Sequence, residues 1–309
     1  MKGLANCILI LVIFINSSCK QNNQLSPEPI EIDFTKTEVE NYNLKNPGFP
    51  STNFKVAISA IISPREGLTY YKDLIEYLEQ KTNISYSIIQ RKTYQEVNLL
   101  LRTNQVNLAF VCSGAYISEK TISDIEILAV PQSNGKTTYK AYIIANKNSS
   151  IEKFEDFKGK SFAFTDPLSN TGRLYGLKRL KENGVSENDF FSRTIYSNAH
   201  DTSIQLVSKN VIDGATVDGL IFEFIKKNNP KRIENLKVIE KSEEFGIPPI
   251  VVPKNLNEGL KAKIKFTFLN IHNDSIGKKI LDNLLIDKFV EGFDYNYNSI
   301  REMHKIVNK

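Results

Sequence analysis

From residue 54 onward, apolar residues alternate between short continuous runs and runs spaced three or four positions apart. The short runs predict strands at 54–59, 84–89, 106–111, 125–130, 139–145, 160–165, 193–196 and 215–217. The spaced runs predict helices between them, among these 94–102, 151–157, 173–183 and one that begins at Ala115. This alternation predicts right-handed βαβ units, and therefore an α/β fold with mainly parallel sheets.

A polar stretch at 166–172 separates the strand expected at 160–165 from the helix expected at 173–183. Helices usually carry acidic residues in their first turn, yet 168–180 contain none. The stretch supplies neutral hydroxyl and amide groups and one small residue: Ser169, Asn170, Thr171 and Gly172. A helix N-terminus of this kind can hold an external anion. The alternative is an ordinary N-cap without a ligand.

Other polar residues fall at the carboxyl ends of further predicted strands: Ser59, Ser113, His200 and Asp218. In open α/β sheets, ligands bind beyond these ends and against helix N-termini, so we expect one site there. His200 could donate to an anion, more strongly if protonated, or could cap the next helix with Asp201. Asp218 could accept a ligand proton or pair with an amine, or could be a solvated acid.

The first nineteen residues have the pattern of a bacterial lipoprotein signal. Residues 1–18 contain Lys2, an apolar core at 8–15 and two small residues before Cys19, which would carry the lipid. The core is too short to span a bilayer, and Asn16 stands where leucine is usual. The alternative is a secretory signal with an incidental cysteine. Both interpretations place the mature protein outside the cytoplasm.

Residues 19–51 are polar and without periodicity, which predicts a flexible tether or, alternatively, an edge element. Beyond the tether, Cys112 is the single cysteine, so no disulfide framework or metal spacing exists. The net charge of +5 over 309 residues is too mild for a nucleic-acid partner. No Walker loop, zinc-ligand pair, dinucleotide fingerprint or nucleophile elbow occurs. We therefore expect no metal, no cofactor and no catalysis.

Four segments carry a resemblance to a known family: DPLSNTGR (166–173), YSNAHDTS (196–203), LAFVCSG (108–114) and SPREGLTYY (63–71). In residue types and in their order along the chain, these segments resemble those of the substrate-binding proteins of phosphate, phosphite and phosphonate ABC transporters. The resemblance spans roughly 54–253. Gly67 and Cys112 depart from residues that are common in the family, and both lie in the half that faces the ligand's variable part.

The resemblance implies a bilobal periplasmic-binding-protein fold of type 2, with two lobes joined by hinge strands. Lobe 1 would comprise 52–139 and 248–309, and lobe 2 would comprise 140–247. Ligand binding would close the lobes, and the closed form would dock on the membrane permease. Position by position, the family's ligand-binding residues would be Ser59, Tyr71, Ser113, Ser169, Asn170, Thr171, Gly172, His200 and Asp218. Tyr71 could instead be one more aromatic on an apolar helix face.

The expected function is a lipid-anchored solute-binding protein that captures a phosphorus oxyanion and delivers it to an ABC importer. A sensor that feeds a two-component kinase would share the fold and the site. An enzyme acting on phosphorylated metabolites is a third hypothesis. Thr171 or Ser169 with His200 and Asp218 would supply the residue types of a hydrolytic triad. The absence of a nucleophile elbow speaks against catalysis.

Overall fold

A computed structural model describes residues 42–43 and 54–308. The expected signal at 1–18, Cys19 and most of the tether at 19–51 lie outside the described residues. Tyr42–Asn43 are an exception to the tether prediction, because they form strand β1, antiparallel to a strand of the first sheet. None of the helices in the described part of the chain combines the length and apolar character needed to cross a bilayer.

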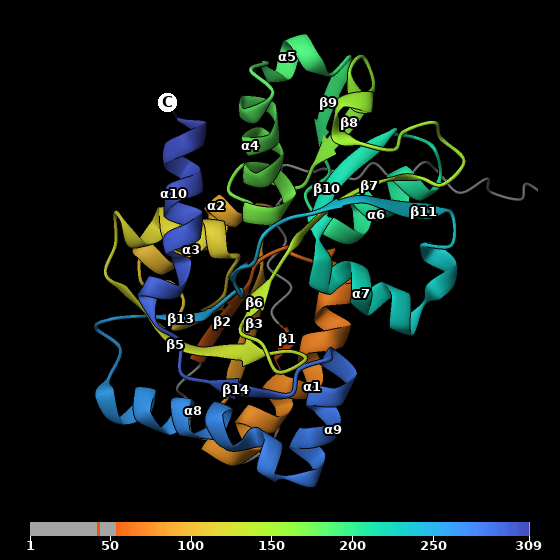
Figure 1. Ribbon diagram of the computed structural model, residues 1–309. Helices are drawn as coiled ribbons and strands as arrows, with labels where there is room; N and C mark the ends of the chain where they lie inside the picture. The colour runs from red at the N-terminus through yellow and green to blue at the C-terminus, as the bar shows by residue number, and fades with distance from the viewer. Residues whose placement is uncertain (1–41, 44–53, 309) are drawn as a thin grey trace, which may run out of the picture. The chain divides into compact units, whose positions relative to one another are not determined.

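The first sheet has seven strands in the order β1-β3-β2-β4-β13-β5-β14. Beyond β1, these are β3 (Tyr86–Gln90), β2 (Phe54–Ile58), β4 (Leu108–Phe110), β13 (Ile250–Pro253), β5 (Ile125–Gln132) and β14 (Lys288–Val290). Its helices are α1 (Pro64–Thr82), α2 (Tyr94–Arg102), α3 (Ser113–Lys120), α8 (Glu258–Asn270) and α9 (Ser275–Leu284) (Figure 1). We call this sheet and these helices lobe 1.

Alternating side chains of β2 show how both faces of this sheet are buried. Val56 and Ile58 pack into a core cluster with apolar residues of α1, α8 and α9. Ala57, between them, packs into a second cluster with residues of α2 and α3. Because successive strand residues point to opposite faces, helices must cover both sides of the sheet.

The second sheet has five strands in the order β11-β7-β10-β8-β9. The strands are β11 (Leu236–Lys241), β7 (Ala141–Asn146), β10 (Gly214–Asp218), β8 (Ser161–Phe164) and β9 (Arg193–Tyr196). The helices are α4 (Tyr175–Glu182), α5 (Glu187–Phe190), α6 (His200–Ser208) and α7 (Gly219–Asn228). We call this part lobe 2. The strand membership of the two sheets supports the lobe boundaries that we propose at 139/140 and 247/248.

Both sheets are mixed, whereas we expected mainly parallel ones. Parallel pairs join β3, β2 and β4 in lobe 1 and β10, β8 and β9 in lobe 2. The chain leaves lobe 1 through β5, β6 (Thr138–Tyr139) and β7, and returns through β11, β12 (Phe245–Gly246) and β13. Each outgoing strand pairs with a returning one, so these three pairs are antiparallel.

Two predicted helices differ from the structure near their starts. Only Phe154–Phe157 are helical in the range 151–157, as a 3-10 turn, because the Asp156 carboxylate accepts the N–H groups of Glu152 and Lys153. The helix expected from Ala115 begins two residues earlier, at Ser113. The predictions for 94–102 and 193–196 are confirmed.

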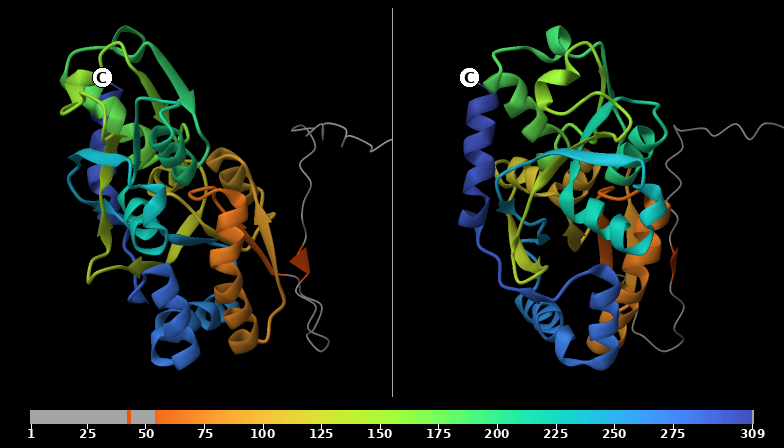
Figure 2. Two further views of the ribbon diagram at one scale, coloured as in Figure 1. Left: turned by 90° about the vertical axis from the view of Figure 1, so that its right-hand side faces the viewer. Right: turned by 45° about the vertical axis from the view of Figure 1, so that its right-hand side comes forward.

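The C-terminal helix α10 (Asn298–Val307) contacts both lobes. Its buried Ile300 and Met303 belong to the core cluster that contains Tyr116 of α3 and Leu180 of α4. Figures 1 and 2 show α10, in dark blue, running beside α4. The hydroxyl of Tyr116 also donates to Asp294, just before α10, at 2.7 Å. The last segment of the chain is therefore not confined to lobe 1.

The start of β10 offers a test of how tightly lobe 2 is packed. A Cβ on Gly214 would lie 2.0 Å from Cε1 of the fully buried Phe157 ring. We expect Gly214→Ala to lower the free energy of unfolding by about 1–3 kcal/mol, as for overpacked cores. Gly259→Ala, whose Cβ would meet its nearest atom at 3.4 Å in an exposed helix turn, should be neutral or slightly stabilising. Urea denaturation of both variants measures the difference, and equal stabilities would contradict the packing.

Candidate functional site

The predicted anion loop at 166–172 leads from β8 into a short π-helix, η2 (Asn170–Leu174), which continues as α4. Ser169 is the N-cap, and its Oγ accepts the Gly172 N–H at 2.9 Å. The helix expected from 173 therefore starts at 170, one wide turn earlier. π-helical turns are rare and are frequently found at functional sites.

Hydrogen bonds within the loop, from α2 and from β10 fix the conformation of this loop. The Asp166 carboxylate accepts the N–H of Leu168 at 2.8 Å and that of Tyr94, in lobe 1, at 3.0 Å. Thr216 of β10 donates its hydroxyl to the Thr171 carbonyl at 2.6 Å. Burial raises the pKa of Asp166, although both N–H bonds oppose this shift. The loop's own acid is thus engaged in shaping the loop and in joining it to lobe 1.

Two glycines bring backbone segments into close contact here. A Cβ on Gly172 would lie 2.5 Å from the Thr165 side chain, so only glycine fits beneath the loop. A Cβ on Gly114, near the start of α3 in lobe 1, would lie 2.4 Å from the Leu168 carbonyl oxygen and 2.8 Å from the Asn170 nitrogen. The N-terminal turn of α3 and the anion loop therefore press against each other across the lobes.

The helix end faces lobe 1 rather than solvent. Ser169, Asn170 and Thr171 are each at most 1% exposed. Among the described residues, no Asp or Glu side chain hydrogen-bonds to 169–172. The positive end of the helix is thus buried between the lobes without a carboxylate of the protein bound to it.

Among the described residues, the buried polar side-chain atoms without a hydrogen-bond partner include Thr171 Oγ1, Asn170 Oδ1, Arg173 Nε, Ser59 Oγ and Tyr94 Oη. An unpartnered buried polar group costs about 1–3 kcal/mol. Asn170 does use its amide NH₂, which donates to the Tyr139 hydroxyl at 3.2 Å. The fold therefore concentrates unsatisfied hydrogen-bonding capacity at one place, as a polar ligand would require.

Tyr94 is a site residue that the sequence analysis missed. It is the first residue of α2, directly after the loop that follows β3, and it is fully buried. Burial, and then the nearby Cys112, Asp166, Asp218 and Tyr139 side chains, raise its pKa well above the ordinary value. The other candidates were selected because residues that follow the carboxyl ends of parallel strands meet at one edge of the sheet. The same rule applies to Tyr94, because β3 is parallel to β2.

His200 is neutral in this structure. Its Nδ1 accepts the Asp218 N–H at 3.0 Å and faces the Thr165 hydroxyl at 3.1 Å, so the ring hydrogen belongs on Nε2. Burial lowers its pKa to about 3. The expectation that His200 could act as a protonated donor is therefore corrected: it can donate only as a neutral imidazole, through Nε2.

Asp218 ends β10 and caps α7, where its Oδ1 accepts the N–H of Leu220 at 2.7 Å. Burial raises the pKa of Asp218 to about 7, although the cap bonds oppose this shift. The group can therefore hold or accept one proton near neutral pH. Burial, and the nearby Asp218 charge, raise the pKa of Tyr71 to about 12, so that phenol stays protonated.

The lobe 1 candidates differ in what they can offer a ligand. The Ser113 hydroxyl donates to the Gly246 carbonyl in the hinge at 2.6 Å, so at the site Ser113 can offer its backbone N–H. The Ser59 hydroxyl is buried and unpartnered. The Tyr71 ring packs on Phe110 at 4.8 Å and lines a cavity that Asp218 also lines, whereas no residue of the anion loop lines it. Tyr71 is thus associated with Asp218 rather than with the loop itself.

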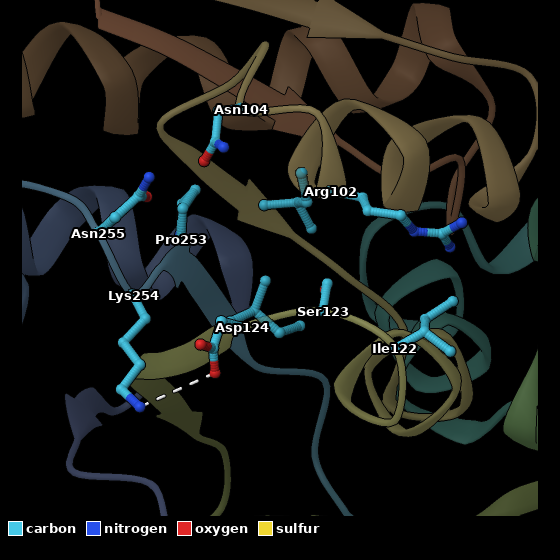
Figure 3. A pocket seen from close by; sticks show the side chains of 10 residues that line it. Arg102, Asn104, Ile122, Ser123, Asp124, Pro253, Lys254 and Asn255 are labelled. Carbon is cyan, nitrogen blue, oxygen red and sulfur yellow. Dashed lines mark ion pairs between the residues drawn. The ribbon is translucent and has the colours of Figure 1, made fainter.

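Lobe 1 borders two cavities, which differ in their lining residues. One of about 320 Å³ lies between the lobes and is lined by Tyr71 and Asp218, among others. The other, of about 480 Å³, lies at the opposite edge of the lobe 1 sheet and is lined by 101–104, 122–125 and 253–255. Figure 3 shows that the polar ends of its side chains point in different directions. Its Lys254–Asp124 pair, at 3.8 Å, is mostly exposed, so this second cavity lacks a converging set of donors.

Comparison with known proteins agrees with this architecture. A family model described as "ABC transporter, phosphonate, periplasmic substrate-binding protein" matches residues 56–297. The phosphonates-binding periplasmic protein of Escherichia coli K12 is 27% identical over 235 residues, 74% of this chain and 69% of that protein.

Two solved structures have the same fold. A binding protein component of an ABC phosphonate transporter from Pseudomonas aeruginosa has a TM-score of 0.78 at 24% identity, covering 82% of this chain and 86% of that one. PhnD1 of Prochlorococcus marinus, in complex with methylphosphonate, has a TM-score of 0.76 at 22% identity, covering 83% and 98%. The type 2 periplasmic-binding-protein fold is therefore confirmed. The family is one of binding components rather than enzymes, and this chain belongs to the family of periplasmic substrate-binding proteins of phosphonate ABC transporters.

Proposed function

We propose that the protein is an extracytoplasmic lipoprotein, anchored through Cys19, that captures a phosphorus oxyanion between its lobes and delivers it to an ABC permease. The observation that carries the proposal is the set of buried, unpartnered groups around the helix end at 169–172. An anion there would meet the buried hydroxyls of Thr171 and Tyr94 and the positive pole of the helix. The phosphonates and methylphosphonate named for the relatives support phosphonate, phosphite or phosphate as the ligand class.

Each donor has a role in this proposal. The Thr171 backbone N–H, the Thr171 hydroxyl and the Tyr94 hydroxyl would donate to phosphoryl oxygens, and His200 would donate through Nε2. The N–H groups of Ser169 and Gly172 already donate to the Asp166 carbonyl and to Ser169 Oγ. Asp218 would share one proton with the ligand. Hydrogen bonds to an ionised acceptor are roughly twice as strong as neutral ones. Fully ionised sulfate has no proton to share, so Asp218 would discriminate against it.

Contacts remote from the anion loop would stabilise the closed form. Asp201 of lobe 2 accepts the Ser63 N–H at 2.8 Å and its hydroxyl at 2.6 Å. Arg232 of lobe 2 pairs with Glu66 of lobe 1 at 2.6 Å. These bonds form only when the lobes meet. A permease that binds only the closed form would therefore bind the protein only when it carries its ligand.

Substitutions of Thr171 test the anion loop. Thr171→Ala should weaken binding by about 1–3 kcal/mol, as for a lost hydrogen bond to a charged group. Thr171→Glu should abolish binding while the fold survives, because a carboxylate would occupy the anion position. Thr171→Ser, which keeps the hydroxyl, is the matched control. Calorimetry against phosphate, phosphite, methylphosphonate and aminoethylphosphonate measures the effect. Normal binding by Thr171→Glu would refute the loop assignment, and no binding of any probe by the wild type would refute the function.

Gly114→Ala tests whether the contact between α3 and the anion loop belongs to the ligand-bound form. The new methyl group would meet backbone atoms of Leu168 and Asn170, which cannot rotate away. We expect methylphosphonate affinity to fall about 5- to 150-fold, the equivalent of 1–3 kcal/mol of strain, with an unchanged melting temperature in the absence of ligand. Wild-type affinity would show that the lobes bind their ligand without this contact.

The pKa of Asp218 predicts a pH dependence of stability. Between its ordinary value of 3.8 and about 7, the folded protein keeps a proton that the unfolded chain releases. Stability should therefore fall as pH rises through this window, by up to about 4 kcal/mol, and level off above it. In Asp218→Asn, which can still cap α7, this fall should disappear. The melting temperature of the variant, relative to that of the wild type, should therefore rise as pH rises from 4 to 7. Asp124→Asn, with a side chain 84% exposed, should show no such gain. Parallel pH profiles of Asp218→Asn and wild type would contradict the shifted pKa.

A further inference from the structure

The interlobe cavity of about 320 Å³ extends from Asp218 and Tyr71 away from the anion loop. Its walls come from α7 of lobe 2 and from α1, β13 and the α9–β14 connection of lobe 1. Most of its lining is apolar or aromatic, including Tyr70, Phe110, Leu220, Phe224, Ile247 and Leu285. Small-molecule pockets start at roughly this volume, so the cavity exceeds what an inorganic anion held at the helix end requires.

Ring contacts give the cavity firm walls once the lobes meet. Tyr70 of α1 packs edge-on against Phe224 of α7, with ring centroids 4.7 Å apart across the lobes. Tyr71 packs on Phe110 within lobe 1 at 4.8 Å. Aromatic pairs of this kind are stabilising beyond the area they bury. The cavity is therefore bounded by fixed apolar surfaces contributed by both lobes.

Charged groups on the lining are mostly engaged with the protein itself. Glu244 pairs with Lys136 at 2.5 Å and accepts the Thr138 hydroxyl at 2.7 Å. Glu223 accepts the Tyr142 hydroxyl at 3.2 Å. Asp218, at the inner end, caps α7. A ligand amine inside the cavity would lose its hydration to mainly apolar walls, which is unfavourable, whereas an apolar group would gain from burial.

Leu285, the C-cap residue of α9, lines the cavity in an unfavourable backbone conformation. Its φ of 57° lies in the left-handed region, which is unfavourable for leucine by about 1 kcal/mol or more. Its carbonyl accepts the Ser133 hydroxyl at 2.9 Å, and its side chain packs against the lobe 2 cluster that contains Tyr142 and Phe222. This conformation directs an apolar side chain of lobe 1 across the cleft.

We propose that this cavity receives the organic substituent of the ligand, and that the preferred ligands are phosphonates carrying an apolar group larger than methyl. This inference rests on the proposed phosphoryl-binding function. The phosphoryl head would lie at the helix end of 169–172, and the substituent would extend past Asp218 between Tyr71 and α7. The chain would thus favour alkyl- and arylphosphonates over inorganic phosphate and over aminoalkylphosphonates.

A ligand series with the wild-type protein tests the inference directly. Calorimetry would compare inorganic phosphate, methyl-, butyl-, phenyl- and aminoethylphosphonate in one buffer. Burial of each added methylene should raise affinity roughly threefold, and thus about 30-fold from methyl to butyl. The heat capacity change should become more negative along the series. If phosphate or methylphosphonate bound as tightly as butylphosphonate, the inference would fail while the proposed function stood. If no probe bound, the proposed function itself would fail.

A cavity-filling variant provides an independent measure. Leu220 is half-buried in the first turn of α7 and lines the cavity. In Leu220→Trp, the ratio of butyl- to methylphosphonate affinity should fall from about 30 to near one, because the indole would occupy the substituent's space. Leu99→Trp, at a position 51% exposed on α2, is the matched control and should keep the wild-type ratio. A ratio unchanged in Leu220→Trp would place the substituent elsewhere.

Discussion

The structure depends on burying a helix end whose hydrogen-bonding groups are held in place but not satisfied. Asp166, Thr165 and Thr216 fix the loop backbone, while Thr171 Oγ1 and the Tyr94 hydroxyl lack partners. Such groups carry a desolvation cost when the lobes meet around them. The ligand that we propose, which supplies acceptor oxygens, would remove this cost only in the closed form. Binding and closure would therefore be linked by the same buried groups.

Chain topology explains how two lobes can move and still form one site. The outgoing and returning strands pair with each other from β5·β13 through β6·β12 to β7·β11, so the connection is a continuous antiparallel ribbon. Ser113 donates across to Gly246 in this ribbon, next to the anion loop. A ribbon can bend where its pairing is shortest, and β6 and β12 have two residues each. The hinge that we propose would thus lie beside the candidate site.

Much of the site was predictable, because residues at the carboxyl ends of parallel strands meet at one edge of a sheet. This rule, with the family resemblance, selected Ser169 to Gly172, His200 and Asp218, which the structure brings together. The same rule covers Tyr94, which we overlooked because it stands at the start of a helix rather than directly at a strand end. The rule did not reveal that the Ser113 hydroxyl bonds to the hinge, because that bond joins Ser113 to Gly246, far away in the chain.

The same distinction holds for the fold. The period of apolar residues predicted the strands from β2 to β10 and several helices, because a strand buried on both faces is apolar along its length. It did not predict β11, β12, β13 or β14. It could not give strand direction, because a crossing strand and a parallel core strand are equally apolar. Similarly, the π-turn at 170–174 depends on the Ser169 carbonyl and side chain accepting from Leu174 and Gly172, a choice that no periodicity encodes.

In the function that we propose, the charge states of His200 and Asp218 would give the site its selectivity. The Asp218 N–H donates to His200 Nδ1, so the two groups form one unit in which burial keeps the imidazole neutral and favours a protonated carboxyl. A cationic histidine would attract any anion, whereas a neutral donor set must be matched in geometry and proton count. Helix dipole and hydrogen bonds would then supply the affinity, and the shared proton at Asp218 would distinguish anions of similar shape. The apolar walls beyond Tyr71 would then select the ligand's substituent.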